Sequence, residues 1–595
     1  MNYKKILIGC MTISLLIGLA SCNKSLDERL ANPNYPVAST ADVDLYLNQV
    51  QLAFNNVWVT ASDYGAQLTR QQQWVGPFYR NAYTPASFDG EWETAYAGGS
   101  AQFGAYYGTL GPSATAYGGV IPNADALIKL AKTQKKYIQS GIARILKAFT
   151  MGILVDDFGD VPYSEANQGN ANTNPKVDAG ATIYAGIQAQ LDSAILDLQN
   201  PDAGAPPAND LFYPGSKKDE IASWTTLAKT LKLKFYMQTR LVDNTAPAKI
   251  QALLTENDLI NDPSQDFVFK YGTSVTNPDS RHEHYALDYV NSGGVGEYIC
   301  NYFMWMVTAQ KYGGTVNLNG DPRARYYFYR QVSSYGWANS QTCPCFVNSQ
   351  FGASPTYPAW YPSVPDKTPY CQIGLGYMGR DHGDNSGAPP DGSFRTAFGV
   401  YPAAGQFDAD QFDAVSLGAG GQGAGINPIW LSSFTSFLEA EAALTLNITS
   451  QGTPRDLLEA GINTSIQKVM SFPATVNVST DTFAPKPTQI SNYVNLVLNK
   501  YDAATTDDQR LNIIMTEYYL ALWGNGVEPY NNYRRTGKPD NAQIAVAVPN
   551  PGFFMRSMYY PSVFVNRNAN APAQKTPGDA VNKVFWDNNP DNFVK

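Results

Sequence analysis

The sequence has little charge and few histidines. Of its 595 residues 16% are charged and 44% are hydrophobic, a balance that excludes a disordered chain. Lys and Arg number 42 against 51 Asp and Glu, a net charge of −9, so nucleic acid is not an expected partner. With three histidines, a Ser-His-Asp triad has few possible bases, and neither a nucleophile elbow nor a phosphate-binding loop occurs.

Long hydrophobic runs are also missing, because no stretch after the N-terminal segment reaches the roughly 18 apolar residues of a membrane span. The first 20 residues combine Lys4 and Lys5 with a short apolar stretch, the pattern of a secretory signal. This stretch closes on Leu-Ala-Ser-Cys at residues 19–22, which resembles the bacterial lipobox; the alternative is an ordinary signal with a cysteine nearby. We therefore expect a signal peptide over 1–21 and a mature chain that Cys22 anchors by lipid.

Cysteine is scarce as well. Besides Cys10 in the signal and the proposed anchor Cys22, the sequence contains only Cys300, Cys343, Cys345 and Cys371. In an exported chain these allow one or two disulfides or free buried thiols. The alternative is a four-thiolate zinc site that uses Cys343 and Cys345, although structural zinc sites usually space their close cysteines by two to four residues.

Apolar residues recur at steps of three and four in five stretches, which predicts amphipathic helices. These stretches are 138–153, 183–198, 224–235, 434–444 and 511–522. Between about 243 and 427 the pattern gives way to Gly, Pro, Asn, Ser and Tyr, so loops and short strands are expected there. The aromatic residues of this stretch indicate that it packs.

Three carboxylates, those of Asp156, Asp157 and Asp160, lie at a predicted helix end beside Gly159 and could serve acid–base catalysis or bind a divalent cation. The turn favours a structural role in which they accept hydrogen bonds. The glycine pattern of residues 418–423 resembles a dinucleotide-binding turn, but its flanking sequence favours a flexible loop.

His282 and His284 would lie on one side of a strand, but a zinc site needs a third ligand that the sequence does not locate. Residues 380–385 could bind calcium, yet they lack the full spacing of a known cation loop. Their candidate ligands are Asp381, Asp384 and Asn385. No metal or cofactor is therefore expected.

Two clusters mix aromatic rings with amides or arginine, the combination that binds sugars, since ring faces stack on aromatics and hydroxyls bond to planar polar groups. The candidate ligand-binding residues are Trp74, Tyr79, Arg80, Tyr83, Trp92, Trp337, Trp360 and Tyr361. Each could instead pack in the core, because aromatic side chains are mostly buried. Trp74 is the first choice.

Several blocks resemble the SusD/RagB nutrient-binding outer-membrane lipoproteins. The hallmark is the run over 143–149 that continues through 156–166 (Asp-Asp-Phe-Gly-Asp-Val-Pro-Tyr-Ser-Glu-Ala). Further blocks lie at 183–195, 210–234, 437–442, 461–466, 532–539, 559–561 and 584–587. The clearest departure is Val563, where the resemblance leads us to expect a glutamate.

The resemblance implies a mainly α fold, in which tetratricopeptide-like helix pairs carry an irregular, loop-rich part with few short strands. It implies a single domain over 22–595, with helical blocks at about 40–240 and 428–595 around an irregular insert at about 243–427. Arg534 and Arg535 would brace loops against acids rather than contact substrate.

The resemblance further implies a surface-exposed lipoprotein that binds a glycan or peptide without catalysis and delivers it to a SusC-like TonB-dependent transporter. Two alternatives stay open at this point. One is a lipid-anchored glycoside hydrolase that uses an Asp/Glu pair. The other is a tetratricopeptide scaffold that binds only proteins.

Overall fold

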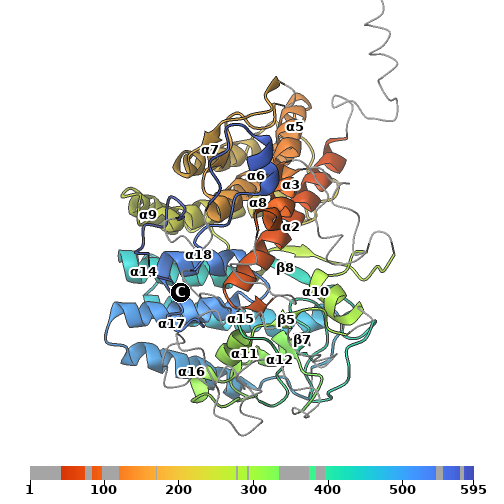
Figure 1. Cartoon of the computed structure of the whole chain (residues 1–595), viewed down its shortest axis with the longest axis vertical. Coiled ribbons are helices and arrows are strands. Elements are labelled where there is room, and N and C mark those ends of the chain that lie inside the picture. Colours follow the sequence, from red (N-terminus) through yellow and green to blue (C-terminus); the bar gives the residue numbers. More distant parts are fainter. Residues whose placement is uncertain are drawn as a thin grey trace, which may run out of the picture.

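The computed structural model describes most of the chain, in ranges separated by gaps. These ranges are 42–73, 84–96, 119–168, 171–276, 279–290, 294–333, 374–382, 395–480, 482–543, 554–575, 582–591 and 593–594. Within them the chain is mainly helical and its strands form two-stranded sheets (Figure 1). The predicted mainly α fold with few short strands is confirmed.

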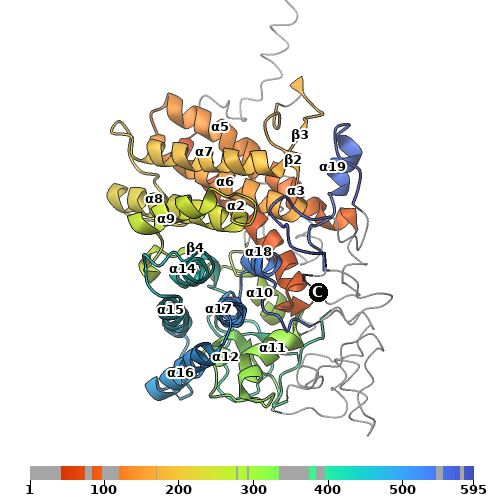
Figure 2. The ribbon, with the colours of Figure 1, turned by 90° about the vertical axis from the view of Figure 1, so that its left-hand side faces the viewer.

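The first group of helices packs as a stack of sequential neighbours. Its members are α2 (Val43–Leu68), α3 (Asp89–Tyr96), α5 (Val120–Thr133), α6 (Tyr137–Phe158), α7 (Gly180–Leu198), α8 (Lys217–Thr239) and α9 (Ala246–Glu256). α6 packs against α2, α5 and α7, and α8 packs against α7 and α9 (Figure 2). The predicted stripes at 138–153, 183–198 and 224–235 face the core from α6, α7 and α8.

Polar residues set the ends of these helices. α2 begins after Asp42, whose carboxylate accepts hydrogen bonds from the backbone N–H of Asp44 at 2.8 Å and of Leu45 at 3.3 Å. α6 ends at Gly159, which adopts a positive φ of 84°. By length and composition α6 could cross a membrane, but 89% of its most apolar stretch is buried, so it is the central helix of this group.

The second group repeats this arrangement. It comprises α14 (Ser432–Leu446), α15 (Pro454–Thr475), α16 (Pro487–Ala503), α17 (Asp507–Ala521) and α18 (Val527–Thr536). α15 packs against α14, α16 and α17, and Figure 2 shows these helices below the first group. The stripes at 434–444 and 511–522 correspond to α14 and α17, as predicted.

The two groups meet along a strand pair and a close backbone contact. Strands β4 (Phe267–Lys270) and β8 (Ile426–Trp430) pair antiparallel. A Cβ on Gly65 of α2 would lie 2.1 Å from the carbonyl oxygen of Gly526, just before α18, so only glycine permits this approach. The buried hydrophobic side chains of both groups form one cluster.

The stretch 243–427 also contains helices that the sequence pattern does not indicate. Its elements after α9 are η4 (Pro263–Gln265), β4, α10 (Glu283–Tyr285), η5 (Ala286–Val290), β5 (Tyr298–Ile299), α11 (Asn301–Thr308), η6 (Gln310–Tyr312), α12 (Ala324–Tyr327), β6 (Phe328–Tyr329), β7 (Ala397–Phe398) and the start of β8. All eight residues of α11 are buried, so the helix has no polar face and no stripe. Tyr326, Tyr327 and Tyr329 are buried, which agrees with the prediction that this stretch packs.

Candidate ligand-binding face

At the end of α2 the chain turns into a short strand that joins the middle of the sequence. Arg70 adopts a left-handed conformation with φ 69°, and β1 (Gln72–Gln73) then pairs with β5. Just before the strand, the carbonyl of Gln71 accepts a hydrogen bond from the backbone N–H of Cys300 at 3.0 Å. We call this place the β1–β5 junction.

Arg70 ties the junction to a distant part of the sequence. Its side chain is buried, and Nε donates to the carbonyl of Gln543 at 2.9 Å. The guanidinium also lies over the rings of Tyr533 and Phe554, at 5.1 and 5.3 Å from their centroids. Gln543 and Phe554 are the two described residues on either side of 544–553, so both flanks of that segment are held at Arg70.

A second segment is held at the same place. Arg380 and Arg395 both lie over the ring of Tyr298 in β5, with their guanidinium carbons 4.3 and 4.0 Å from its centroid. The backbone N–H of His382 donates to Oε1 of Gln543 at 3.1 Å. His382 and Arg395 are the described residues that flank 383–394.

The predicted aromatic segment also begins at this junction. Gln73, the last described residue before 74–83, pairs with Tyr298 in the β1–β5 sheet. Flanking residues of three separate segments thus meet at the β1–β5 junction. Most of the predicted ligand-binding residues lie outside the described residues, namely Trp74, Tyr79, Arg80, Tyr83, Trp337, Trp360 and Tyr361.

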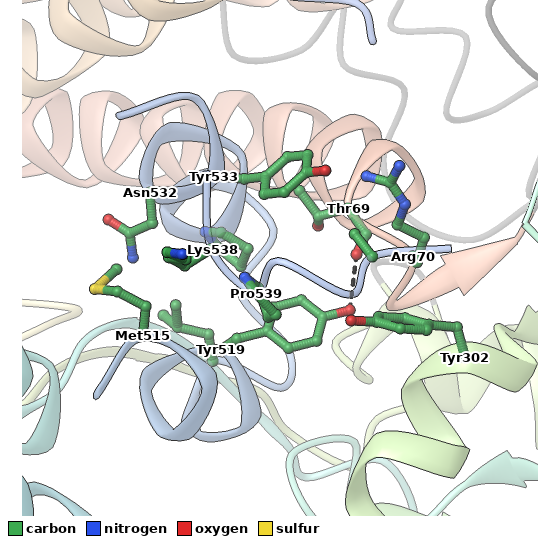
Figure 3. Close-up of a pocket in the computed structure, with 12 residues that line it drawn as sticks. Thr69, Arg70, Tyr302, Met515, Tyr519, Asn532, Tyr533, Lys538 and Pro539 are labelled. Carbon is green, nitrogen blue, oxygen red and sulfur yellow. Dashed lines mark hydrogen bonds between the residues drawn. The ribbon is translucent and has the colours of Figure 1, made fainter. Parts of the chain in front are cut away.

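A small cavity lies behind Arg70, where α2, α11, α17 and α18 meet (Figure 3). The hydroxyl of Tyr519 donates across it to the carbonyl of Thr69 at 2.7 Å, and Tyr302 and Tyr533 form part of its wall. Its volume is about 10 Å³, space for roughly one water molecule, so no sugar ring fits inside. The cavity therefore belongs to the support of the junction rather than to a binding site.

The two neighbouring histidines lie beside the junction, not on a strand as predicted. His282 caps the N-terminus of α10, where its Nδ1 accepts from the backbone N–H of His284 at 3.2 Å. Nδ1 of His284 lies 3.0 Å from the carboxylate of Glu297, and Nε2 lies 3.2 Å from Nε2 of Gln72. Its ring stacks on Phe398 at 4.1 Å.

The pKa values of these histidines diverge because their neighbours differ. Burial lowers the pKa of His282 to about 4. Burial also opposes protonation of His284, but Glu297, Asp63 and Glu283 outweigh it and raise the pKa of His284 to about 10. His284 therefore forms an ion pair with Glu297, whereas His282 is neutral. Among the described residues no group of three or more His, Cys, Asp or Glu could hold a metal ion.

The acidic helix end has the structural role that the turn favours. Asp156 accepts hydrogen bonds from Nε1 of Trp586 at 2.9 Å and Nδ2 of Asn531 at 2.8 Å. Asp160 accepts from the backbone N–H of Gly180 at 2.8 Å. These bonds tie the end of α6 to α7, α18 and the C-terminal segment.

The arginine pair of α18 is buried and contributes to the same framework. Arg534 donates to the carbonyls of Asp156 at 2.7 Å and of Arg556 at 2.9 Å. Arg535 binds both carboxylate oxygens of Glu441. The expectation of bracing against an acid holds for Arg535, whereas Arg534 braces the structure through backbone carbonyls.

The remaining sequence candidates carry no chemistry in the described structure. Residues 418–423 form turns that lead to β8 without an intervening helix, as a loop rather than a dinucleotide site. Asp381 accepts from Asn301 at 3.3 Å, whereas Asp384 and Asn385 lie outside the described residues.

Cys300 is a buried free thiol, and burial raises its pKa to about 12. The other cysteines, including the anchor candidate, lie outside the described residues, namely Cys10, Cys22, Cys343, Cys345 and Cys371.

Trp92 is the one predicted ligand-binding residue within the described ranges. It lies in α3 and is 7% exposed. Its ring stacks on Phe564 of α19 (Ser562–Arg567) at 4.4 Å and contacts Tyr96 at 4.6 Å. Trp92 therefore packs largely against its neighbours, yet it also borders an open pocket together with Val563. The sequence did not indicate this pocket because its residues come from three separate segments.

Comparison with known proteins identifies the family. One family model, described as starch-binding and associating with the outer membrane, matches residues 107–340. A second, described as the SusD and RagB outer membrane lipoprotein, matches residues 422–572. No curated protein matches.

Solved structures share the fold over 92% of this chain. A SusD/RagB family protein from Bacteroides thetaiotaomicron is 17% identical with a TM-score of 0.59, and all of that chain is covered. A chitin-binding protein is 18% identical with a TM-score of 0.57 and full coverage of its chain. A chitin-binding SusD homologue from Flavobacterium johnsoniae is 17% identical with a TM-score of 0.52 and 99% coverage. Since the two family matches together span more than half of the sequence, the chain belongs to the SusD/RagB family of outer-membrane lipoproteins, which are non-catalytic proteins that bind nutrients such as glycans.

Proposed function

We propose that this lipoprotein binds an oligosaccharide at the face above the β1–β5 junction and delivers it to a SusC-like TonB-dependent transporter. The observation that carries the proposal is the meeting of three segment flanks at Arg70, Tyr298 and Gln543. The segment that leaves Gln73 contains the aromatic and polar side chains that suit sugars.

The chain that follows the second predicted cluster reaches the same junction. Within residues 374–382 the carbonyl of Arg380 accepts a hydrogen bond from the backbone N–H of Asn301 at 2.9 Å. We therefore propose that Trp337, Trp360 and Tyr361 contribute to the same ligand-binding face. Aromatic rings would stack on sugar faces while Arg80 bonds to hydroxyls.

The structure beneath this face is held by buried side chains that contact several segments. Arg70 and Tyr298 are buried. Arg70 contacts both flanks of 544–553, and Tyr298 contacts Gln73 and Arg395, which flank 74–83 and 383–394. Fixed flanks reduce the conformational entropy that a binding segment loses when it engages a ligand. This arrangement supports a binding role that needs no covalent step.

Chitin fragments are the ligand class to test first. Two similar structures are named as chitin-binding, and one matching family model is named as starch-binding. The proposal is therefore an oligosaccharide of pyranose rings, with chito-oligosaccharides before malto-oligosaccharides. A peptide ligand is the alternative.

The remaining parts of the proposal concern the anchor and the partner. We propose that Cys22 carries the lipid and that residues 22–595 act as one domain over the transporter. The continuous hydrophobic core supports one domain, because both helix groups contribute to it. The tether would keep the binding face close to a transporter in the same membrane.

Calorimetric titration of the mature protein with chitohexaose and maltohexaose tests the binding face. The variants are Trp74→Ala and Trp360→Ala, and Tyr236→Ala on α8 is the matched control. We expect wild type and the control to bind one of the two sugars and Trp74→Ala to bind at least about tenfold more weakly. If both Trp74→Ala and Trp360→Ala bound the sugar as tightly as the wild type, the proposed face would be contradicted.

A further inference from the structure

We infer that the pocket bordered by Trp92 is a second carbohydrate site, which takes one pyranose ring. It lies where α3, α19 and the turn between β2 (Val161–Pro162) and β3 (Val177–Asp178) meet, and Figure 2 shows these elements together at one corner of the molecule. The pocket shares no residue with the β1–β5 junction. We call it the α3–α19 pocket.

The floor of the α3–α19 pocket is apolar and largely aromatic. The ring of Trp92 packs there against those of Phe564 and Tyr96, with centroid distances of 4.4 and 4.6 Å. Pro162 and Val563 complete this surface. Such a floor matches the C–H face of a sugar ring.

Hydrogen bonds between segments fix the walls. The hydroxyl of Tyr96 donates to the carbonyl of Pro162 at 2.6 Å. On the opposite side, Nδ2 of Asn568 donates to the carbonyl of Pro175 at 2.9 Å. Asp89 at the start of α3 accepts from the backbone N–H of Val563 at 3.1 Å. All three elements are therefore held in place before any ligand arrives, which lowers the entropy lost on binding.

The rim carries polar side chains that are available for a ligand. Within the described ranges, the side chains of Glu93, Asn167 and Arg567 make no hydrogen bond or ion pair, and all three line the pocket. Asn167 and Arg567 are exposed, and Glu93 is half-buried. The rim thus offers a carboxylate acceptor, a guanidinium donor and an amide that does both.

This chemistry favours a neutral polyol over other ligands. An ion would be attracted by one rim charge and repelled by the other, whereas sugar hydroxyls donate to Glu93 and accept from Arg567. The volume of about 220 Å³ lies below the roughly 300–1,000 Å³ of clefts that enclose drug-sized ligands. One ring therefore enters, and the rest of an oligosaccharide chain would remain outside.

The α3–α19 pocket and the proposed β1–β5 face would bind the same class of ligand through different residues. An experiment can therefore disprove one of the two proposals without affecting the other. Saturation-transfer NMR on the full mature chain, in a sugar-free detergent, would use methyl glycosides of glucose, mannose, galactose and N-acetylglucosamine as probes. Two variants alter the α3–α19 pocket: the double variant Glu93→Ala/Arg567→Ala removes rim groups, and Ala166→Trp fills the space beside them. Both are made in the Trp74→Ala protein, so that the proposed β1–β5 face does not contribute to the signal. The control in the same background is Arg510→Ala, which changes a half-buried arginine on α17.

We expect at least one glycoside to show saturation transfer from the Trp74→Ala protein that falls at least fivefold in both pocket variants and is unchanged in the Arg510→Ala control. The inference would be overturned by the absence of transfer to any glycoside at about 50 mM, or by transfer that survives in both pocket variants. If no saturation transfer is assigned to the α3–α19 pocket while the wild-type protein still binds chitohexaose, this inference fails and the proposed function stands. Capture of a tripeptide with an aromatic side chain in place of every glycoside would also contradict the sugar assignment.

Discussion

Glu441 on α14 accepts two hydrogen bonds from the guanidinium of Arg535 on α18, with Nε–Oε1 and Nη2–Oε2 distances of 3.0 and 2.6 Å. Arg240 at the end of α8 reaches the same carboxylate at 2.8 Å. Although burial opposes ionisation, the two arginines hold the pKa of Glu441 below its usual value. One carboxylate thus joins three helices from both helix groups.

Replacing Glu441 by glutamine should destabilise the protein strongly. The amide cannot balance two buried guanidinium charges, and breaking a buried ion pair in this way lowers the free energy of unfolding by about 3–5 kcal/mol. Urea unfolding followed by circular dichroism measures this loss. Glu459→Gln on α15, whose side chain is 44% exposed, should change stability by less than about 1 kcal/mol. A loss in Glu441→Gln no larger than in this control would refute the role of Glu441.

Gly65→Ala should destabilise the contact between α2 and the start of α18. The added Cβ would lie 2.1 Å from the backbone oxygen of Gly526, which cannot move aside like a flexible side chain. Overpacking of this kind lowers the free energy of unfolding by about 1–3 kcal/mol. The control is Gly215→Ala, where the nearest atom is 3.5 Å away, and thermal unfolding of the two variants side by side decides the matter. Similar melting temperatures would show that the approach is looser than described.

His284 should make stability fall with rising pH. Its pKa is about 10 in the folded state against 6.5 unfolded, so the folded state binds the proton more tightly. The contribution of His284 to the free energy of unfolding is complete below pH 6.5 and is lost between pH 6.5 and 10. The loss is at most about 1.4 kcal/mol for each pH unit. The difference in unfolding free energy between wild type and His284→Gln should therefore shrink across this window. A difference that stays constant from pH 6 to pH 10 would contradict the ion pair with Glu297.

Cys22→Ser should release the protein from the membrane. Serine offers no thiol for the lipid, and the one described helix that could span a bilayer is buried in the core. Labelled palmitate should enter the wild-type protein and not the variant, which should move to the soluble fraction after cell disruption. Equal labelling of the two would place the anchor elsewhere.

The sequence predicted α7 because its apolar residues face one side and periodicity survives when the other side is polar. It also predicted α6 from its apolar stripe, although nearly all residues of α6 are buried. α2 escaped because polar residues such as Gln51 are buried among its apolar ones, and α11 escaped because all eight of its residues are buried. The family blocks placed the arginine pair of α18 correctly in a bracing role. Sequence spacing could not show that Arg70 and Gln543 meet, since they are 473 residues apart.

For the candidate sites too, the sequence indicated local chemistry but not contacts between distant residues. Local chemistry was enough to suggest Trp92, but its stacking on Phe564 joins residues from opposite ends of the chain. The histidine pair was placed on a strand because alternation is the only local clue. The structure instead puts His284 in α10, where it contacts Phe398 and Glu297, residues distant in the sequence from the predicted strand.

The most direct test of the account is calorimetric titration of the purified mature protein with chitohexaose and maltohexaose, followed by mass spectrometry of the recovered sugar after a day. The account predicts saturable binding of at least one of them, with every recovered chain at its original length. Shortened chains at catalytic protein concentration, or no heat with either sugar, would contradict a non-catalytic glycan-binding role.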